Sequence, residues 1–297
     1  IEKLTVADLQ AVAKKYYKTS NRTYGLFIPD ASPDRTVVAE TPDIAKMLNG
    51  YKGKEVAAQK ETFENNIDNI AKHTEYGTLA NGAKYALLQK PTKGDKVTAT
   101  ITLRFGDENS LMNTSEAGGL LAGLLETGTT TRSRQQIADE LDKIKSGFRF
   151  NSTGSGLAVS ISSDKKNLPA ALNLLQDILL HPKFDADEFA KLKAKYKADY
   201  ETRMNEPDQQ ASDRMEKLTS NYPKGHPLYA SDTREEMEEM NAVTLEDVKK
   251  YYARFYGGNN SVSSFVGEID KPAILSFLQN TIGNWNSKAS YAQVVPK

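Results

Sequence analysis

Residues 97–126 read VTATITLRFGDENSLMNTSEAGGLLAGLLE, and this stretch decides the fold class. Over residues 97–105 apolar and polar side chains alternate, which predicts a strand with one buried face. The residues expected on the buried face are Val97, Ala99, Ile101, Leu103 and Phe105. A helix is predicted to follow over about 115–126. The stretch therefore predicts a strand that is half buried and leads into a helix.

The neighbouring segments extend this pattern on both sides. Before it, residues 75–89 contain Asn81-Gly82 between apolar residues, which is the signal of a β-hairpin. After it, a short strand is predicted over 157–161 and helices over 133–145, 168–180 and 185–204, with more helix to Leu218. Strands and helices do not alternate one for one. This order predicts an α+β fold with an antiparallel sheet packed by helices.

The two ends of this sequence resemble each other. Residues 4–28 read LTVADLQAVAKKYYKTSNRTYGLFI, and residues 243–270 read VTLEDVKKYYARFYGGNNSVSSFVGEID. A shift of 239 positions places Thr5 on Thr244, with an N-cap, a helix, an Asn-containing turn and a strand over 24–28 expected in the first copy. Chance similarity between two helix-turn-strand units is one explanation. The favoured one is an internal repeat of domain size.

A linker is predicted between the first copy and the main body. Residues 29–65 contain Pro29, Pro33 and Pro42, many charges and one short helix candidate, 43–49. This composition is typical of a semi-rigid linker, and a disordered tail is the alternative.

Composition excludes several classes of function. The 39 Lys and Arg balance the 39 Asp and Glu, so nucleic acid and anionic membranes are not expected partners. Without cysteine, disulfides, thiolate nucleophiles and iron–sulfur clusters are excluded. The longest apolar run, 118–125, is too short to span a membrane. The sequence begins with Ile1 and no signal-peptide pattern follows, so it reads as a piece of a longer protein.

Four phrases, in this order, resemble an M16 (pitrilysin/insulinase-type) zinc peptidase domain. They are residues 104–129, 174–189, 225–237 and 251–270, and the resemblance covers about 66–290. It implies an M16 metallopeptidase-like (LuxS/MPP-like) domain, of which such enzymes have two in each half of a clamshell. The expected organisation is then 1–28 as the C-terminal stub of a preceding homologous domain, 29–65 as the interdomain linker, and 66–297 as an M16-like domain lacking the zinc motif.

The family's zinc motif is His-x-x-Glu-His on a helix. When the Gly-Thr that follows it in the family is aligned with Gly128-Thr129, the two histidine positions fall on Gly119 and Gly123 and the general base on Ala122. The family's third ligand, a Glu, falls at or beside Asp199, and Tyr200 is an equally good position. Small residues that let a helix pack closely explain the glycines without reference to a lost site. Under either explanation no catalytic or metal-binding residue is expected in this chain.

The remaining candidate residues are weaker. His73, His181 and His226 are far apart in the sequence, and each is expected to be structural or solvated. The run 152–156, STGSG, lacks the nucleophile-elbow order and a following Lys, so a turn between strands is the better interpretation.

The leading hypothesis is therefore a fragment from the non-catalytic half of an M16-type zinc peptidase that hydrolyses peptides or small unfolded proteins, itself inactive. The chain would form part of the chamber wall, with zinc held in the parent enzyme, and bacterial relatives imply a periplasmic or exported location. Its partners would be the catalytic M16 half, in the same polypeptide or a separate subunit, and peptide substrate. A scaffold or partner subunit without peptidase function is the alternative, and an unrelated α+β fold is a third possibility.

Overall fold

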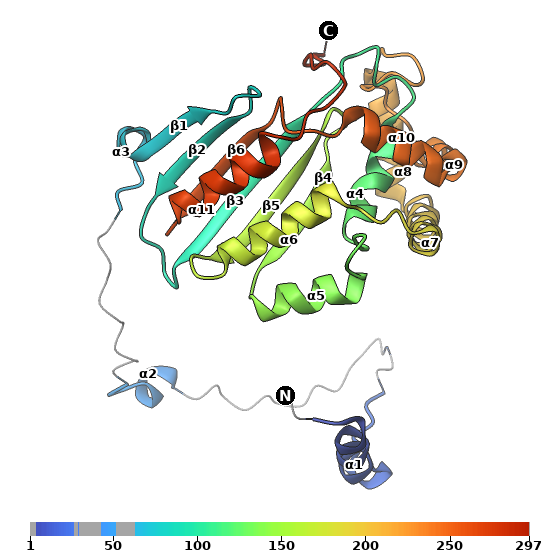
Figure 1. Ribbon diagram of the computed structural model, residues 1–297. Coiled ribbons are helices and arrows are strands. Elements are labelled where there is room, and N and C mark those ends of the chain that lie inside the picture. Colours follow the sequence, from blue (N-terminus) through green and yellow to red (C-terminus); the bar gives the residue numbers. More distant parts are fainter. Residues whose placement is uncertain (1–3, 27–28, 30–42, 52–62, 297) are drawn as a thin grey trace. The chain divides into compact units, whose positions relative to one another are not determined.

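A computed structural model describes residues 4–26, 29, 43–51 and 63–296 of the chain (Figure 1). The chain divides into two compact units, Ile1–Ala57 and Ala58–Lys297. Within the described parts, no helix is both long and apolar enough to cross a membrane.

The larger unit is built on a six-stranded sheet in the order β1-β2-β6-β3-β5-β4. Its strands are β1 (Thr74–Thr78), β2 (Lys84–Gln89), β3 (Lys96–Arg104), β4 (Gly147–Ser152), β5 (Gly156–Asp164) and β6 (Val262–Gly267). Neighbouring strands pair antiparallel, with the exception of β2 and β6, which are parallel. The predicted α+β class is confirmed, and the sheet is antiparallel apart from this one pair.

The hairpin and the alternating strand form where the sequence predicts them. The turn between β1 and β2 is closed by a hydrogen bond of 2.8 Å from the Leu79 N–H to the Ala83 carbonyl, and Gly82 there has φ +90°. That backbone conformation favours glycine. The five residues expected to face inward, four on β3 and Phe105 directly after it, are all buried.

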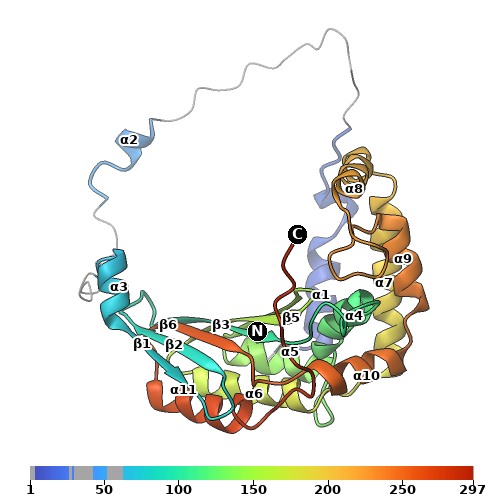
Figure 2. The same ribbon diagram turned by 90° about the horizontal axis from the view of Figure 1, so that it is seen from above.

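The helices of this unit cover one face of the sheet or gather at one end, apart from α3 (Ile67–His73), which lies at the opposite end beside β1 and β2 (Figure 2). The others are α4 (Ser115–Leu125), α5 (Arg134–Lys143), α6 (Leu168–Leu180), α7 (Ala186–Arg203), α8 (Pro207–Thr219), α9 (Thr233–Ala242), α10 (Leu245–Phe255) and α11 (Lys271–Phe277). Figure 2 shows α6 and α11 on the same face of the sheet, with α7, α8 and α9 beyond its edge. Leucines of α4 and α6 join the inward residues of β3 and β5 in one core.

The sequence did not predict α3, α9 or α11. The α9 segment, TREEMEEMNA, has too few apolar residues for a helical period to be visible. It is stabilised instead by a capping box between Asp232 and Glu235 and by burial of Met240. Local capping and one anchoring side chain suffice here because α7 packs alongside α9.

The smaller unit contains α1 (Val6–Tyr16), a 3₁₀ turn (Thr19–Asn21) and α2 (Ile44–Met47). The strand expected over 24–28 is not formed at residues 24–26, and 27–28 lie outside the described residues. A strand needs a neighbour for its backbone hydrogen bonds, and the described residues of this unit contain no other strand. Of the predicted linker, 30–42 and 52–62 lie outside the described residues.

The two copies of the repeat begin in the same way. In α1 the Thr5 hydroxyl accepts the Asp8 N–H at 3.2 Å while the Asp8 carboxylate accepts the Thr5 N–H at 2.9 Å. Thr244 and Asp247 of α10 form the same pair of bonds at the same distances. Helix α10 therefore starts and ends 239 positions after α1, as the repeat predicts.

Candidate functional site

The residues aligned with the family's zinc motif line a cavity on the outer side of α4. Gly119, Ala122 and Gly123 form one wall of this space of about 550 Å³, which we call the glycine cavity. The opposite side of α4 carries Leu120, Leu121, Leu124 and Leu125 into the core, and of the three small residues Gly119 and Gly123 are half-buried while Ala122 is buried. Its other walls come from β4 and α7, namely Phe150, Asn151, Ser152, Glu188, Lys191, Leu192, Lys195 and Tyr196, with Glu126, Thr127 and Arg134 completing it.

Helix α7 occupies the space beside Gly123. A Cβ atom on Gly123 would lie 2.9 Å from Leu192 Cδ2 and 3.0 Å from the Tyr196 hydroxyl. At Gly119, by contrast, a Cβ would meet no atom within 4 Å. A larger side chain at position 123 therefore requires α7 side chains to move, whereas position 119 has room.

These residues do not fit a zinc ion. Zinc sites in proteins use imidazole, thiolate or carboxylate donors, and two glycines and an alanine supply none of them. Asp199 is exposed on α7 and does not line the glycine cavity, which α7 reaches with Leu192, Lys195 and Tyr196. Among the residues that the structure describes, no group of three or more His, Asp or Glu could hold a metal ion.

Charged side chains ring the glycine cavity. The Glu188 carboxylate lies 3.4 Å from Arg134 Nη1 and 2.8 Å from Lys191 Nζ. Burial raises the pKa of Glu126, against a hydrogen bond from the Phe150 backbone and the nearby Arg134. The cavity is thus a polar groove beside the edge strand β4.

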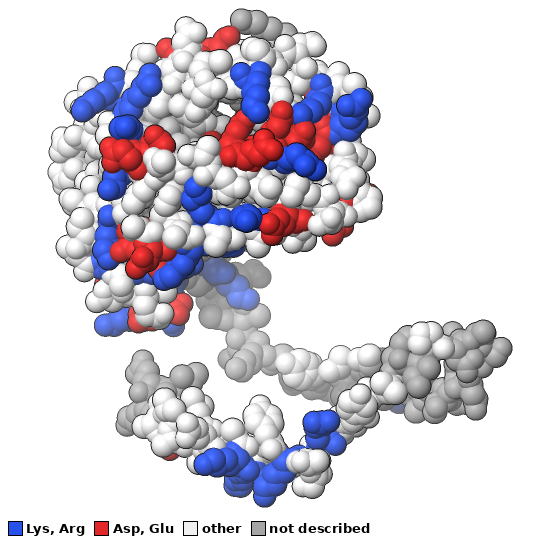
Figure 3. Space-filling model, turned by 90° about the vertical axis from the view of Figure 1, so that its right-hand side faces the viewer, with Lys and Arg blue, Asp and Glu red and all other residues white. Residues whose placement is uncertain are grey.

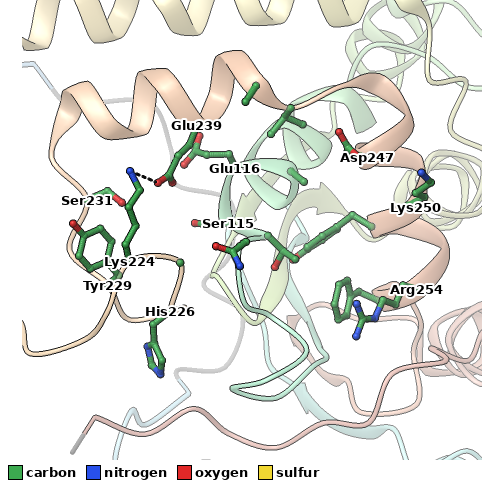
Figure 4. A pocket seen from close by; sticks show the side chains of 18 residues that line it. Ser115, Glu116, Lys224, His226, Tyr229, Ser231, Glu239, Asp247, Lys250 and Arg254 are labelled. Carbon is green, nitrogen blue, oxygen red and sulfur yellow. Dashed lines mark ion pairs between the residues drawn. The ribbon is translucent and has the colours of Figure 1, made fainter.

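A second cavity, of about 530 Å³, lies between the start of α4 and the helices α9 and α10 (Figure 4). Glu116 and Glu239 lie side by side there, and Lys224 Nζ is 3.5 Å from the Glu239 carboxylate. We call this space the Glu116 cavity. Burial and the charges of Glu236 and Glu239 raise the pKa of Glu116 to about 7, although a hydrogen bond of 3.3 Å from the Tyr200 hydroxyl opposes the shift.

Nothing in the sequence singles out Glu116, because an acidic residue in the first turn of a helix is ordinary. Nor does the sequence single out Glu236 or Glu239 of α9, a helix that it did not predict. The signal that could have found them, a helix with acidic residues on the face toward α4, depends on knowing that α9 exists.

The three histidines remain apart, and each has local partners. The ring of His226 is stacked on Tyr222, its Nδ1 accepts the Leu228 N–H at 3.0 Å, and Figure 4 shows it pointing away from Glu116. His181 Nδ1 lies 3.2 Å from the Asp177 carboxylate at the end of α6. His73 Nδ1 lies 2.8 Å from the carbonyl of Asn69 within α3. These are the contacts of structural residues.

Acidic and basic side chains are interspersed on the face that carries the helices α7, α8 and α9. Figure 3 shows red and blue groups next to one another there. Several are ion pairs, such as Lys217 with Glu235 at 2.8 Å and Arg203 with Glu236 at 3.2 Å. This distribution agrees with the charge balance of the sequence.

Comparison with known families identifies two matches in this chain. Residues 85–232 match the model of the insulinase family (peptidase family M16). Residues 242–297 match the model of the peptidase M16 inactive domain.

Individual relatives are distant. An uncharacterised zinc protease of Bacillus subtilis, YmxG, is 22% identical over 212 residues, which are 71% of this chain and 50% of that protein. The chain thus spans about half the length of that relative.

Two solved structures share the fold. A peptidase M16 inactive domain from Pseudomonas fluorescens has a TM-score of 0.64 at 18% identity, over 75% of this chain and 54% of that one. The periplasmic protease PqqL from Escherichia coli has a TM-score of 0.61 at 16% identity, over 76% of this chain and 25% of that one.

Proposed function

We propose, since this chain belongs to peptidase family M16, that it is the non-catalytic part of a zinc-dependent peptidase. In this proposal the chain forms part of the wall of the chamber in which peptides or small unfolded proteins are hydrolysed. Zinc and the catalytic residues belong to a partner half, which lies in the same polypeptide or in a separate subunit.

The observation that carries this proposal is the composition of the glycine cavity. Where an active domain places two imidazoles and a carboxylate, this chain has Gly119, Gly123 and Ala122, and α7 fills the space beside Gly123 with Leu192 and Tyr196. Both changes act against metal binding, since one removes the donor atoms and the other removes the room for a larger side chain at position 123.

The face of the sheet opposite α6 and α11 supports the role as a wall. Along β3 this face carries Thr98, Thr100 and Thr102, all exposed or half-buried. Ser264 of β6 and Ser160 of β5 lie on either side of Thr100 in register. Short hydroxyl side chains leave a flat, wettable surface along which an extended peptide can pass.

Metal content and reconstitution together test the proposal. The purified chain is expected to contain no stoichiometric zinc and to cleave no unstructured fluorogenic peptide. Mixing it with a His-x-x-Glu-His-bearing half of the same enzyme is expected to raise peptide hydrolysis above that of either part alone. One tightly bound zinc per chain that is lost in Asp199→Ala would contradict the proposal.

A matched pair of variants tests the wall itself. Thr100→Arg places a bulky cation on the open sheet face and is expected to lower the reconstituted activity. Ser276→Arg, on the exposed side of α11, is expected to leave that activity unchanged. If the complex forms but its peptide hydrolysis does not exceed that of the separate parts, the chain is a scaffold subunit, which is the alternative function.

An exported location is the last part of the proposal. It is supported by the similarity in fold to a protease described as periplasmic. Cell fractionation with an antibody against the chain tests it, and recovery with cytoplasmic markers alone would contradict it.

A further inference from the structure

The sequence contains two Asn-Gly pairs, one in each compact unit. Asn49-Gly50 follows the short helix α2, and Asn81-Gly82 lies in the turn between β1 and β2. At an Asn-Gly pair the backbone nitrogen of the glycine can attack the side chain of the asparagine, because glycine has no Cβ to shield that nitrogen. The product of the attack is a succinimide ring. Whether a given pair reacts therefore depends on how its two residues are held.

In the β1–β2 turn, hydrogen bonds hold both groups that this reaction needs. The Asn81 carboxamide donates to the Ile282 carbonyl at 2.8 Å and accepts the Ala83 N–H at 3.2 Å. The Gly82 N–H donates to the Leu79 carbonyl at 2.9 Å. For the ring to close, the glycine nitrogen would have to leave its acceptor and the carboxamide would have to turn away from both partners. The turn therefore protects Asn81.

Residues from the far end of the domain also cover this turn. The Asn81 Nδ2 donates to Oδ1 of Asn286 at 3.2 Å, and a Cβ on Gly82 would lie 3.3 Å from the Asn259 carbonyl oxygen. Opening the turn far enough for the ring to close would break these contacts as well. The protection of Asn81 is thus a property of the folded domain and not of the local sequence, which is Asn-Gly at both sites.

The pair after α2 lacks these restraints in the part of the chain that the structure describes. Asn49 and Gly50 are both exposed, and no hydrogen bond of the Asn49 carboxamide is found there. A backbone bond of 2.9 Å from the Tyr51 N–H to the Leu48 carbonyl closes the turn, and the Gly50 N–H takes no part in it. Gly50 has the same φ of +90° as Gly82, so the two pairs differ in their contacts and not in this angle. The Asn49 carboxamide is free to turn toward the Gly50 nitrogen.

We propose that Asn49 is a site of spontaneous deamidation, which converts it to aspartate and isoaspartate while Asn81 remains an amide. The Gly50 nitrogen gives its proton to water and attacks Cγ of Asn49, so the N–Cγ bond forms, the Cγ–Nδ2 bond breaks, and ammonia leaves with a proton from water. A water molecule then opens the succinimide. Opening at Cγ gives aspartate, and opening at the backbone carbonyl gives isoaspartate. Overall one water is consumed and one ammonia is released, and no other reactant is needed.

Both products change the segment that the sequence predicts as a linker. Each adds a carboxylate, which lowers the formal net charge of the chain from zero to minus one. Isoaspartate also adds one carbon to the backbone between residues 49 and 50, so the turn that joins Leu48 to Tyr51 loses its spacing. The charge and the course of the linker therefore change as the protein ages. This proposal does not depend on peptidase activity.

Ageing of the folded chain beside the same chain in urea tests the proposal. Both samples are incubated at pH 8 and digested with trypsin, which separates the two pairs into peptides 47–52 and 73–84 for mass spectrometry. In the folded chain Asn49 is expected to convert at least about tenfold faster than Asn81, because the β1–β2 turn must open before Asn81 can react. In urea the two asparagines are expected to convert at similar rates, since the hydrogen bonds of the turn are lost.

The variant Asn49→Gln is the matched control, since its longer side chain closes a ring far less readily. On ion exchange the folded parent should gain a more acidic species with time, which Asn49→Gln forms much more slowly. An isoaspartyl methyltransferase with labelled S-adenosylmethionine should label the aged parent more strongly than the aged variant. The proposal is wrong if Asn49 remains an amide in the folded chain while it converts in urea, or if Asn81 converts as fast as Asn49 in the folded chain.

Discussion

The carboxylate of Glu116 is partly removed from water by two other helices. Tyr200 of α7 donates to it at 3.3 Å, and the acidic residues Glu236 and Glu239 approach it from α9. Proton binding relieves both the desolvation and the repulsion, which is why the pKa rises from the ordinary 4.5 to about 7. The junction of α4, α7 and α9 is thus sensitive to pH.

The sign of that sensitivity follows from the raised pKa. Between pH 4.5 and about 7 the folded chain retains a proton on Glu116 that the unfolded chain releases, so the free energy of unfolding falls as pH rises. We expect Glu116→Gln, which can still accept from Tyr200, to be more stable than the parent at pH 8 by about 1–3 kcal/mol. At pH 4.5 the two should be equal.

Urea unfolding at pH 4.5, 6 and 8 measures this effect. Glu238→Gln, on the exposed side of α9, is the matched control and should follow the parent at each pH. The free energy of unfolding of Glu116→Gln should still fall to some extent as pH rises, because burial also raises the pKa of Glu236. Equal destabilisation by Glu116→Gln at all three pH values would show that the carboxyl group acts by packing alone.

Among the helices and strands, the sequence predicts those features that depend on a regular local pattern of residues. The helix α6 has the bounds 168–180 that were expected, because its leucines keep a regular period and Pro169 lies at its start. The pairing of β2 with β6 was not predicted, since it joins segments from opposite ends of the domain and no local pattern records it. For the same reason Glu116, Glu236 and Glu239 could not be grouped into one cavity.

The alignment with the zinc motif names residues from sequence alone, but what packs against them could not be predicted. Aligning one motif gives Gly119, Ala122 and Gly123 as residues without donor atoms. That Leu192 and Tyr196 stand against Gly123 requires the packing of α7 on α4, and the sequence pointed instead to Asp199, which lies outside the cavity.

The two equivalent capping boxes allow a direct comparison between elements. Thr244→Ala removes the N-cap of α10, whose Val248, Tyr251 and Phe255 are in the core, and should lower the free energy of unfolding by about 1 kcal/mol. Thr5→Ala removes the same bonds from α1, which has no buried residue, and should leave the main unfolding transition unchanged. Chemical denaturation followed by tryptophan fluorescence of Trp285, near Tyr252 and Tyr256, reports that transition. Equal losses in both variants would mean that α1 folds together with the larger unit.

For the whole molecule, the division into two units bears on how far residues 1–57 contribute to the stability of the larger unit. The described core residues all belong to 83–282, within the larger unit. We therefore expect a chain of residues 58–297 to melt within about 2 °C of the full chain, because the change in the free energy of unfolding is below about 1 kcal/mol. Differential scanning calorimetry of both proteins measures this. A decrease of more than about 5 °C would show that residues 1–57 contribute to the stability of the sheet.

The position of β6 between β2 and β3 has a consequence for the order of folding on the ribosome. The β1–β2 hairpin and the three strands β3, β5 and β4 leave the exit tunnel early, but the strand that joins them is the last of the six to be made. At about 5–20 residues per second, the chain from Asp164 to Gly267 takes roughly 5 to 20 seconds to make, and the two half-sheets wait that long for β6. Throughout that interval β2 and β3 present open edges with which another nascent chain can pair.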